Sequence, residues 1–239
     1  VGADIESGQV IYAKEESLQA DFLNSIFGDV LDYEYKKGVT VTNLEKELKT
    51  QLSSEKADGV LGYFSIEGKK AVSDVRAVIE LKDAQTDLDA HQKRLNDKRT
   101  PVSQAFGYAS KYGGKCKWVI VSDFVNIRLY HASDQSKYEL FHIPDLLKAD
   151  NLKKFFFLLH KASLISEKGI ATIDSLFEEK LEAEKKITKE FYKDYKKIRF
   201  ELFDHLKKYN PDKEEILLLS KSQKLLDRFL FVCFCEDLN

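Results

Sequence analysis

The feature that most constrains the fold of this chain is the segment 78–82, Val-Ile-Glu-Leu-Lys, in which an apolar run ends in a Glu-x-Lys pair. Alternate residues of a β-strand point to the same face, so Glu80 and Lys82 would project together while Leu81 turns into the core. Asp58 lies 22 residues upstream, just before a second apolar segment. The sequence therefore predicts two neighbouring strands that bring two carboxylates and an ammonium group together.

These side chains have the chemistry of a metal-dependent phosphodiesterase. Mg²⁺ prefers oxygen ligands and keeps several waters, so Asp58, Glu80 and the Leu81 carbonyl could hold it against a scissile phosphate. The Lys82 ammonium would orient or help to deprotonate the attacking water and would offset charge on the phosphate. Glu-x-Lys alone is a weak signal, because 33% of the residues are charged. The alternative is a solvated strand end with a surface ion pair.

The remaining pattern predicts a mixed α/β region. Strands are expected at residues 57–65, 73–82, 117–122, 126–131 and 138–143. Helices are expected at Glu15–Leu31, Asn43–Leu52 and Val102–Lys111. The third helix would cross over from the Glu-x-Lys strand to the strand that begins near Trp118, which gives a central sheet flanked by helices.

Beyond Pro144 the sequence is helical. Between residues 167 and 197 eight Lys balance eight acidic residues, a pattern typical of a long solvated helix. The segment Glu214–Glu236 is apolar on more than one side, so we expect it to pack against something. The expected architecture is thus an α/β domain over residues 1–160, followed by an all-α region over residues 161–239.

Several motifs occur together in one order along the chain: Asp58, Glu80–Lys82, Arg99–Ala109, Lys117–Asp123 and Ile127–Tyr130. In this order they resemble the PD-(D/E)xK nuclease domain. More narrowly, they resemble the N-terminal part of type IIG restriction enzymes, in which an endonuclease and a DNA methyltransferase are fused. The resemblance covers roughly residues 15–160 and continues more loosely to Asn239. It implies a restriction-endonuclease-like fold with a mixed central sheet, followed by a helical connector.

The resemblance also implies roles for individual residues. Asp58 matches the first acidic position, Glu80 the metal-binding acid and Lys82 the catalytic lysine, with the Leu81 carbonyl as a further metal ligand. Gln104 and Tyr108 match a Gln-x-x-x-Tyr element and share one helix face. Gln104 is therefore expected in the catalytic group, with a pair that reaches the phosphate backbone or buttresses the lysine. The alternative is a hydrogen bond on the helix surface.

The implied activity is Mg²⁺-dependent hydrolysis of double-stranded DNA by a type II site-specific deoxyribonuclease, with Mn²⁺ able to substitute. Methyltransferase and target-recognition domains would lie in the same polypeptide, and S-adenosylmethionine would bind only there, because this sequence has no motif for it. Cutting both strands would require a transient dimer or two successive nicks. We expect a prokaryotic, cytoplasmic protein without a membrane span, since no apolar run approaches the ~20 residues that a span requires.

Other charged and sulfur-containing residues support weaker predictions. Nine Lys and Arg face five acids between Arg76 and Trp118. Within that segment a basic cluster would contact phosphates or form a solvated loop: Lys93, Arg94, Lys98 and Arg99. Glu45 and Glu47 are expected on a solvated helix face, and the three cysteines are expected to be buried reduced thiols.

Two functions of other classes stay open at this stage. One is a catalytically silent nuclease fold that binds DNA or a protein without cutting. The other is an assembly module whose helical half docks onto another subunit. Retention of all three of Asp58, Glu80 and Lys82 favours the nuclease, because a silent domain has no chemical need for the complete set.

Overall fold

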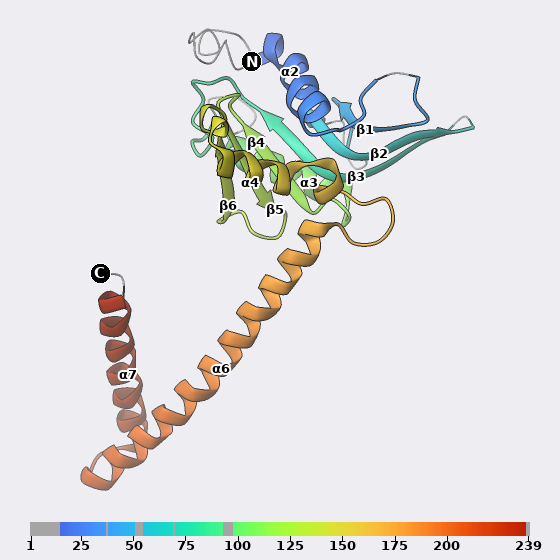
Figure 1. The fold of residues 1–239 in the computed structure, drawn as a ribbon. Helices are drawn as coiled ribbons and strands as arrows, with labels where there is room; N and C mark the ends of the chain where they lie inside the picture. Colours follow the sequence, from blue (N-terminus) through green and yellow to red (C-terminus); the bar gives the residue numbers. More distant parts are fainter. Residues whose placement is uncertain (1–14, 37, 51–54, 69, 93–97, 238–239) are drawn as a thin grey trace. The chain divides into compact units, whose positions relative to one another are not determined.

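The computed structural model describes residues 15–36, 38–50, 55–68, 70–92 and 98–237. The chain divides into two compact units, Val1–Ser175 and Leu176–Asn239. The first unit contains the sheet, and Figure 1 shows its strands with helices around them. The predicted succession of an α/β region and a helical region is therefore confirmed.

The sheet of the first unit is mixed and has six strands in chain order. They are β1 (Val41–Lys46), β2 (Gly59–Glu67), β3 (Lys70–Leu81), β4 (Trp118–Ser122), β5 (Asn126–His131) and β6 (Tyr138–His142). β3 and β4 are parallel, whereas every other neighbouring pair is antiparallel. All five predicted strands are present, and β1 is an additional strand at one edge.

The parallel pair is possible because α3 (Pro101–Tyr112) crosses over between β3 and β4, as predicted. The Thr100 hydroxyl caps the helix by accepting a hydrogen bond from Ser103 N at 3.0 Å, and Pro101 occupies the first turn. α3 then packs on one face of the sheet, where Ala105 shares a buried cluster with Val78. This face carries the polar residues described below.

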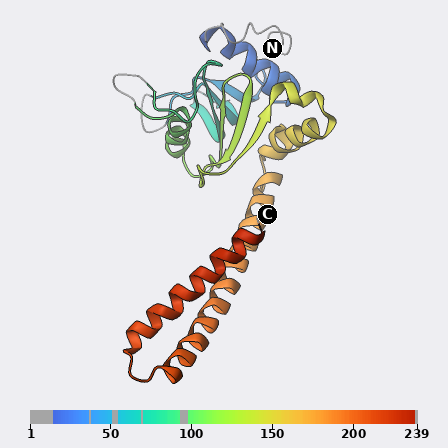
Figure 2. The same cartoon turned by 90° about the vertical axis from the view of Figure 1, so that its left-hand side faces the viewer.

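Other helices cover the opposite face of the sheet (Figure 2). Leu23, in the π-helix η2 (Leu23–Val30), packs tightly on this face, since a Cβ added to Gly59 would lie 3.0 Å from Leu23 Cδ2. Farther along, the Phe155 ring of α4 (Ala149–Leu159) meets Phe141 edge to face, with ring centroids 5.4 Å apart. Both faces of the central strands are thereby shielded from water.

The first predicted helix, Glu15–Leu31, is not a single α-helix. α2 (Glu15–Phe22) continues into the π-helix η2, whose hydrogen bonds join residues five apart. Phe22 and Phe27, also five apart, are both buried with ring centroids at 6.3 Å, whereas Val30 is 41% exposed. The sequence predicts one helix here from apolar residues spaced four apart, Leu18, Phe22, Ile26 and Val30. That prediction was wrong beyond Phe22, because the wider turns present a different set of side chains to the sheet.

The predicted helix Asn43–Leu52 is also wrong, and its last two residues lie outside the described part of the chain. Residues 41–46 instead form β1, which pairs antiparallel with β2. Asn43 is buried and donates a hydrogen bond from Nδ2 to the Gly62 carbonyl at 2.9 Å. Pairing with a ready strand edge outweighs the weak helix propensity of this charged segment. Glu45 and Glu47 therefore do not lie on a helix face.

The C-terminal part of the chain is helical, with α6 (Thr172–Tyr209) and α7 (Glu215–Asp237) as its main elements. The compact units divide after Ser175 and not after residue 160. Buried Ile173 and Asp174 tie the start of α6 to the first unit, since Asp174 accepts a hydrogen bond from Trp118 Nε1 at 2.7 Å. That residues 161–239 act as a connector stays a prediction.

Within the second unit, Tyr195 of α6 donates a hydrogen bond to Asp227 of α7 at 2.7 Å. Large apolar side chains of α7 are exposed, with Ile216 at 83% and Phe231 at 70%. Cys233 and Cys235 are also exposed, which contradicts the predicted burial of these thiols, whereas Cys116 is buried. Among the helices of the described residues, none has the length and apolar character needed to cross a membrane.

Gly62 provides a test of the β2–β3 pairing. It follows a register shift in β2, and a Cβ at this position would lie 2.1 Å from the Asp74 carbonyl oxygen. Because backbone must move to admit a methyl group, Gly62→Ala should lower the free energy of unfolding by about 2 kcal/mol in urea denaturation. Gly114→Ala is the matched control, since no atom lies within 4 Å of its added Cβ. Equal stability of the two variants would contradict the close approach.

Candidate functional site

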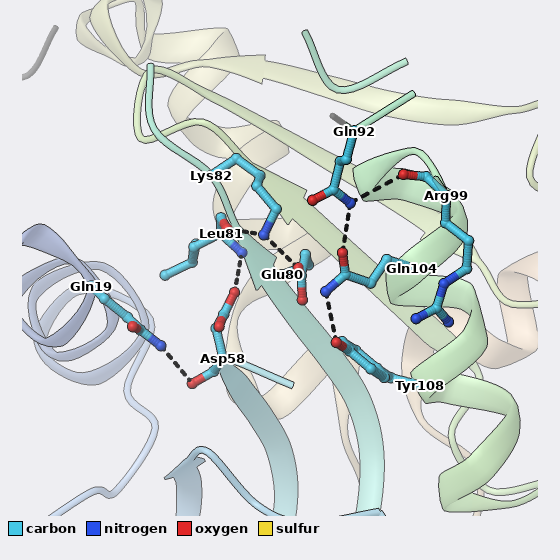
Figure 3. A network of polar contacts seen from close by, with 9 residues as sticks. All are labelled: Gln19, Asp58, Glu80, Leu81, Lys82, Gln92, Arg99, Gln104 and Tyr108. Carbon is cyan, nitrogen blue, oxygen red and sulfur yellow. Dashed lines mark hydrogen bonds and ion pairs between the residues drawn. The ribbon is translucent and has the colours of Figure 1, made fainter. Parts of the chain in front are cut away.

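The antiparallel register of β2 and β3 brings Asp58 to Glu80. Gly59 pairs with Ile79, and Val60 pairs with Val78, so one further step along this register places Asp58 opposite Glu80. Asp58 Oδ2 accepts a hydrogen bond from the backbone N–H of Leu81 at 2.7 Å (Figure 3). This contact fixes the carboxylate at the end of β3, at the point where the Glu-x-Lys pair begins.

Glu80 and Lys82 form a buried ion pair. Their side chains lie on the α3 face of the sheet, because they follow Val78 at intervals of two. Lys82 Nζ lies 2.6 Å from Glu80 Oε1 and 2.8 Å from the Leu81 carbonyl oxygen. The glutamate is 1% exposed and the lysine 4%. The alternative of a solvated strand end with a surface ion pair is therefore wrong.

The oxygens gathered here fit a hard cation. The donor set comprises the carboxylates of Asp58 and Glu80 together with the Leu81 carbonyl, and an ammonium group already binds two of the three residues. Mg²⁺ suits such a set because it keeps several waters. A structural zinc site does not, because zinc takes four protein ligands, commonly His or Cys. Within the described residues, His, Cys, Asp and Glu side chains form no group of three or more that could hold a metal ion. The donor set named above differs, because it consists of two carboxylates and a backbone carbonyl.

Gln104 and Tyr108 lie next to this group and are both buried. Gln104 Nε2 donates a hydrogen bond to Tyr108 Oη at 2.6 Å. Gln104 Oε1 accepts one from Gln92 Nε2 at 2.7 Å, and Gln92 Nε2 also donates to the Arg99 carbonyl at 3.1 Å (Figure 3). The Gln-x-x-x-Tyr pair is thus a buried link in a polar chain, and not a contact on the helix surface.

Gln92 belongs to this series of hydrogen bonds, but no pattern in the sequence predicted it. It lies in the connection between β3 and α3, outside any regular element, and no periodicity marks it. Its side chain reaches Gln104, which is 12 residues away. Because the two residues are distant along the chain, no local signal in the sequence could have found this contact.

Burial raises the pKa of Tyr108 to about 12, with a further contribution from the negative charge of Glu80. The hydrogen bond from Gln104 opposes this shift only in part. The phenol is therefore neutral at physiological pH. Since its oxygen accepts the hydrogen bond from Gln104, its own hydrogen can serve another acceptor.

The predicted basic cluster is only partly described, since Lys93 and Arg94 lie outside the described residues. Arg99 Nη2 lies 3.1 Å from Glu55 Oε1. The carbonyl of Lys98 lies 2.6 Å from a ring nitrogen of His91, which is exposed. Of this cluster, the structure places Arg99 close to the polar chain.

Lys82→Ala tests the buried ion pair. Removing the ammonium leaves a buried carboxylate at Glu80, so the free energy of unfolding should fall by about 3 kcal/mol in chelator-containing buffer. The double variant Glu80→Gln, Lys82→Met removes both charges and should recover most of that loss in chemical denaturation. If the single variant is as stable as the wild type, the pair is not buried as described.

Tyr108 should make the protein sensitive to alkaline pH. Because the pKa is raised in the folded state from an ordinary value of 10.0 to about 12, the contribution to stability is complete below pH 10 and is lost as pH rises through 12. Tyr108→Phe should therefore flatten the fall in thermal stability above pH 10. Tyr209→Phe, at an exposed position of α6, is the control and should keep the wild-type slope. Parallel profiles for all three proteins would refute the shift.

A family model described as MmeI, N-terminal domain, matches residues 9–174, which is more than half of the chain. The structure is similar to one described as a cryoEM structure of a DrdV–DNA complex, with 15% identity over 64% of this chain and 98% of that chain and a TM-score of 0.30. No curated protein sequence matched.

The family match spans every residue of the candidate site, from Asp58 to Tyr108. It therefore includes both strands that supply the carboxylates and the helix that carries the Gln-x-x-x-Tyr pair. The match also confirms the resemblance to the N-terminal region of type IIG restriction enzymes. This chain belongs to the family of MmeI N-terminal domains.

Proposed function

We propose that residues 1–160 are the Mg²⁺-dependent DNA endonuclease domain of a restriction-modification enzyme, and that residues 161–239 connect it to methyltransferase and target-recognition domains of the same polypeptide. Membership of the MmeI N-terminal domain family supports this context. One observation carries the proposal: Asp58, Glu80 and Lys82 meet at the end of β3 around the Leu81 backbone. Burying an ion pair costs desolvation free energy that the attraction between the charges can fail to offset. A pair kept for stability alone is therefore unfavourable, which favours a role in chemistry.

The proposed reaction is hydrolysis of a DNA phosphodiester bond, with the 3′ oxygen as the leaving group. Asp58, Glu80 and the Leu81 carbonyl would hold Mg²⁺, and Mn²⁺ would substitute. When bound, the ion supplies positive charge at the scissile phosphate and makes a water more acidic. The hydrogen bond from Leu81 N orients the Asp58 carboxylate before any cation arrives.

Lys82 contributes a positive charge in a site from which bulk water is largely excluded. Its ammonium would orient the attacking water and balance the negative charge that grows on the phosphate during attack. In the structure it binds Glu80 and Leu81, two of the three residues proposed to hold the metal. The ammonium and the metal therefore compete for the same oxygens, which predicts that loss of Lys82 does not weaken metal binding.

Gln104 acts in this proposal as a positioning residue. Both ends of its amide are bound by protein groups, Gln92 on one side and Tyr108 on the other. It would therefore affect cleavage by fixing the neutral phenol near Glu80, and would not contact DNA itself. S-adenosylmethionine has no part in this region and would bind only in the methyltransferase.

Calorimetric titration with Mn²⁺ tests the site without needing the recognition domain. The wild-type chain should bind Mn²⁺, Glu80→Ala should lose the binding heat, and Lys82→Ala should bind at least as tightly as the wild type. Glu139→Ala is the matched control, because it removes a half-exposed carboxylate on β6 that pairs with Lys154. The control should titrate like the wild type.

Equal titrations for the wild type and Glu80→Ala would reject the metal site and favour a silent DNA-binding or assembly module. Weaker Mn²⁺ binding by Lys82→Ala would reject the competition between ammonium and metal. For the reaction itself, Lys82→Ala should lose cleavage of supercoiled plasmid in Mg²⁺ while it keeps metal affinity. Cleavage by that variant at the wild-type rate would exclude the catalytic role of the lysine.

A further inference from the structure

One face of α3 continues from the candidate site toward the helix end. Gln104, Tyr108 and Lys111 follow one another at helical intervals of four and three, so they lie along the same face. The Arg99 side chain runs beside this face, as Figure 3 shows next to Gln104 and Tyr108. A Cβ on Gly107 would lie 2.9 Å from Arg99 Nη1, so the glycine makes room for the guanidinium group.

A single carboxylate, that of Glu55, holds both cations. Arg99 Nη2 lies 3.1 Å from Glu55 Oε1, and Lys111 Nζ binds Glu55 Oε2. The three side chains are 35%, 29% and 36% exposed for Arg99, Lys111 and Glu55, so water and a ligand can reach them. The hydrogen bond from Lys111, aided by the charges of both cations, holds the pKa of Glu55 below its ordinary value.

This cluster lies beside Tyr108, which Lys111 follows by three residues on the same face of α3. Burial is the main reason for the raised pKa of Tyr108, and the charges of Glu80, Glu55 and Asp58 all add to it. Three carboxylates therefore act on one phenol, two from the candidate site and one from the cluster. In this cluster two cations share one anion.

We propose that Arg99 and Lys111 form a binding site for a backbone phosphate of double-stranded DNA, and that Glu55 occupies this site until the phosphate replaces it. The inference rests on the proposed nuclease function and adds a DNA contact to it. A phosphate, like a carboxylate, presents two oxygens, so it could accept from Arg99 through one and from Lys111 through the other, as Glu55 does here. Such a contact fixes the position of the duplex without reading its sequence.

The charge of the cluster explains why the exchange would favour DNA. Among the described residues of the cluster, two cations share one carboxylate, whereas the whole chain has a formal net charge of −2. When two cations of the protein neutralise DNA phosphates, the duplex releases counterions. The affinity of the protein for DNA then depends steeply on the salt concentration. Glu55 would hold the two long side chains in place in the meantime, so less side-chain entropy is lost on binding.

The test measures how a short fluorescent DNA duplex binds to the whole chain in buffer that contains a chelator. Fluorescence anisotropy reports the binding over a range of salt concentrations. Arg99→Gln and Lys111→Gln should each weaken binding about eightfold at 0.1 M salt and lower the slope of log K against log salt by about 0.9. Arg99→Lys keeps the charge and should keep the slope. Glu55→Gln removes the competing anion and should tighten binding by a similar factor.

Lys185→Gln is the matched control, because it removes a lysine from an exposed ion pair with Glu182 on α6. It should bind DNA like the wild type. Unchanged affinity and slope in both Arg99→Gln and Lys111→Gln would overturn the phosphate site, and weaker or equal binding by Glu55→Gln would overturn the exchange. Because the assay contains no divalent metal, failure here is distinct from failure of the metal titration, which would overturn the nuclease proposal itself.

Discussion

The buried contact of Lys82 with Glu80 and the Leu81 carbonyl is the interaction on which the site depends. Taking two opposite charges out of water is costly, and the pair persists because the ammonium finds two oxygens at short distance. The backbone of Leu81 also holds the residue that precedes β2, since its N–H donates a hydrogen bond to the Asp58 carboxylate. The main chain of Leu81 thus contacts Asp58 through its N–H and Lys82 through its carbonyl, and Lys82 in turn binds the Glu80 carboxylate.

α3 links this site to the hydrophobic core and to the solvent. Its apolar side chains pack on the sheet, and the face beside them carries Gln104 and Tyr108, then Lys111. The same rigid helix therefore supports the phenol near Glu80 and presents a cation outward. Contacts from the β3–α3 connection, through Gln92, hold the middle of that face in one arrangement. This placement agrees with the general need to hold reactive groups on regular elements.

The two compact units differ in how much of their apolar surface they bury. In the first unit, helices cover both faces of the central strands. In the second unit, α7 exposes several large side chains, among them Ile216 and Phe231, and it carries two exposed thiols. Exposed apolar area of this kind favours association with other protein surface. It is compatible with the connector role expected from the restriction-enzyme family.

Several parts of the fold could be predicted from the sequence because their signals are local. The strand period placed Glu80 and Lys82 on one face, and the helix expected at Val102–Lys111 is α3 of the structure. Other features depended on distant partners. β1 is a strand because β2 offers it an edge, and the π-helical turn after Phe22 forms where the sheet selects a different set of side chains.

The sequence by itself thus determined which residues are candidates for the chemistry and where along the chain the strands that hold them lie. Only the tertiary structure decided that the Glu80–Lys82 pair is buried, that Gln104 is bound at both ends, and that Glu55 holds Arg99 and Lys111. The physical reason is that burial and long-range hydrogen bonds depend on which segments meet in space. The periodicity of apolar residues and the composition of a segment report only on neighbours along the chain.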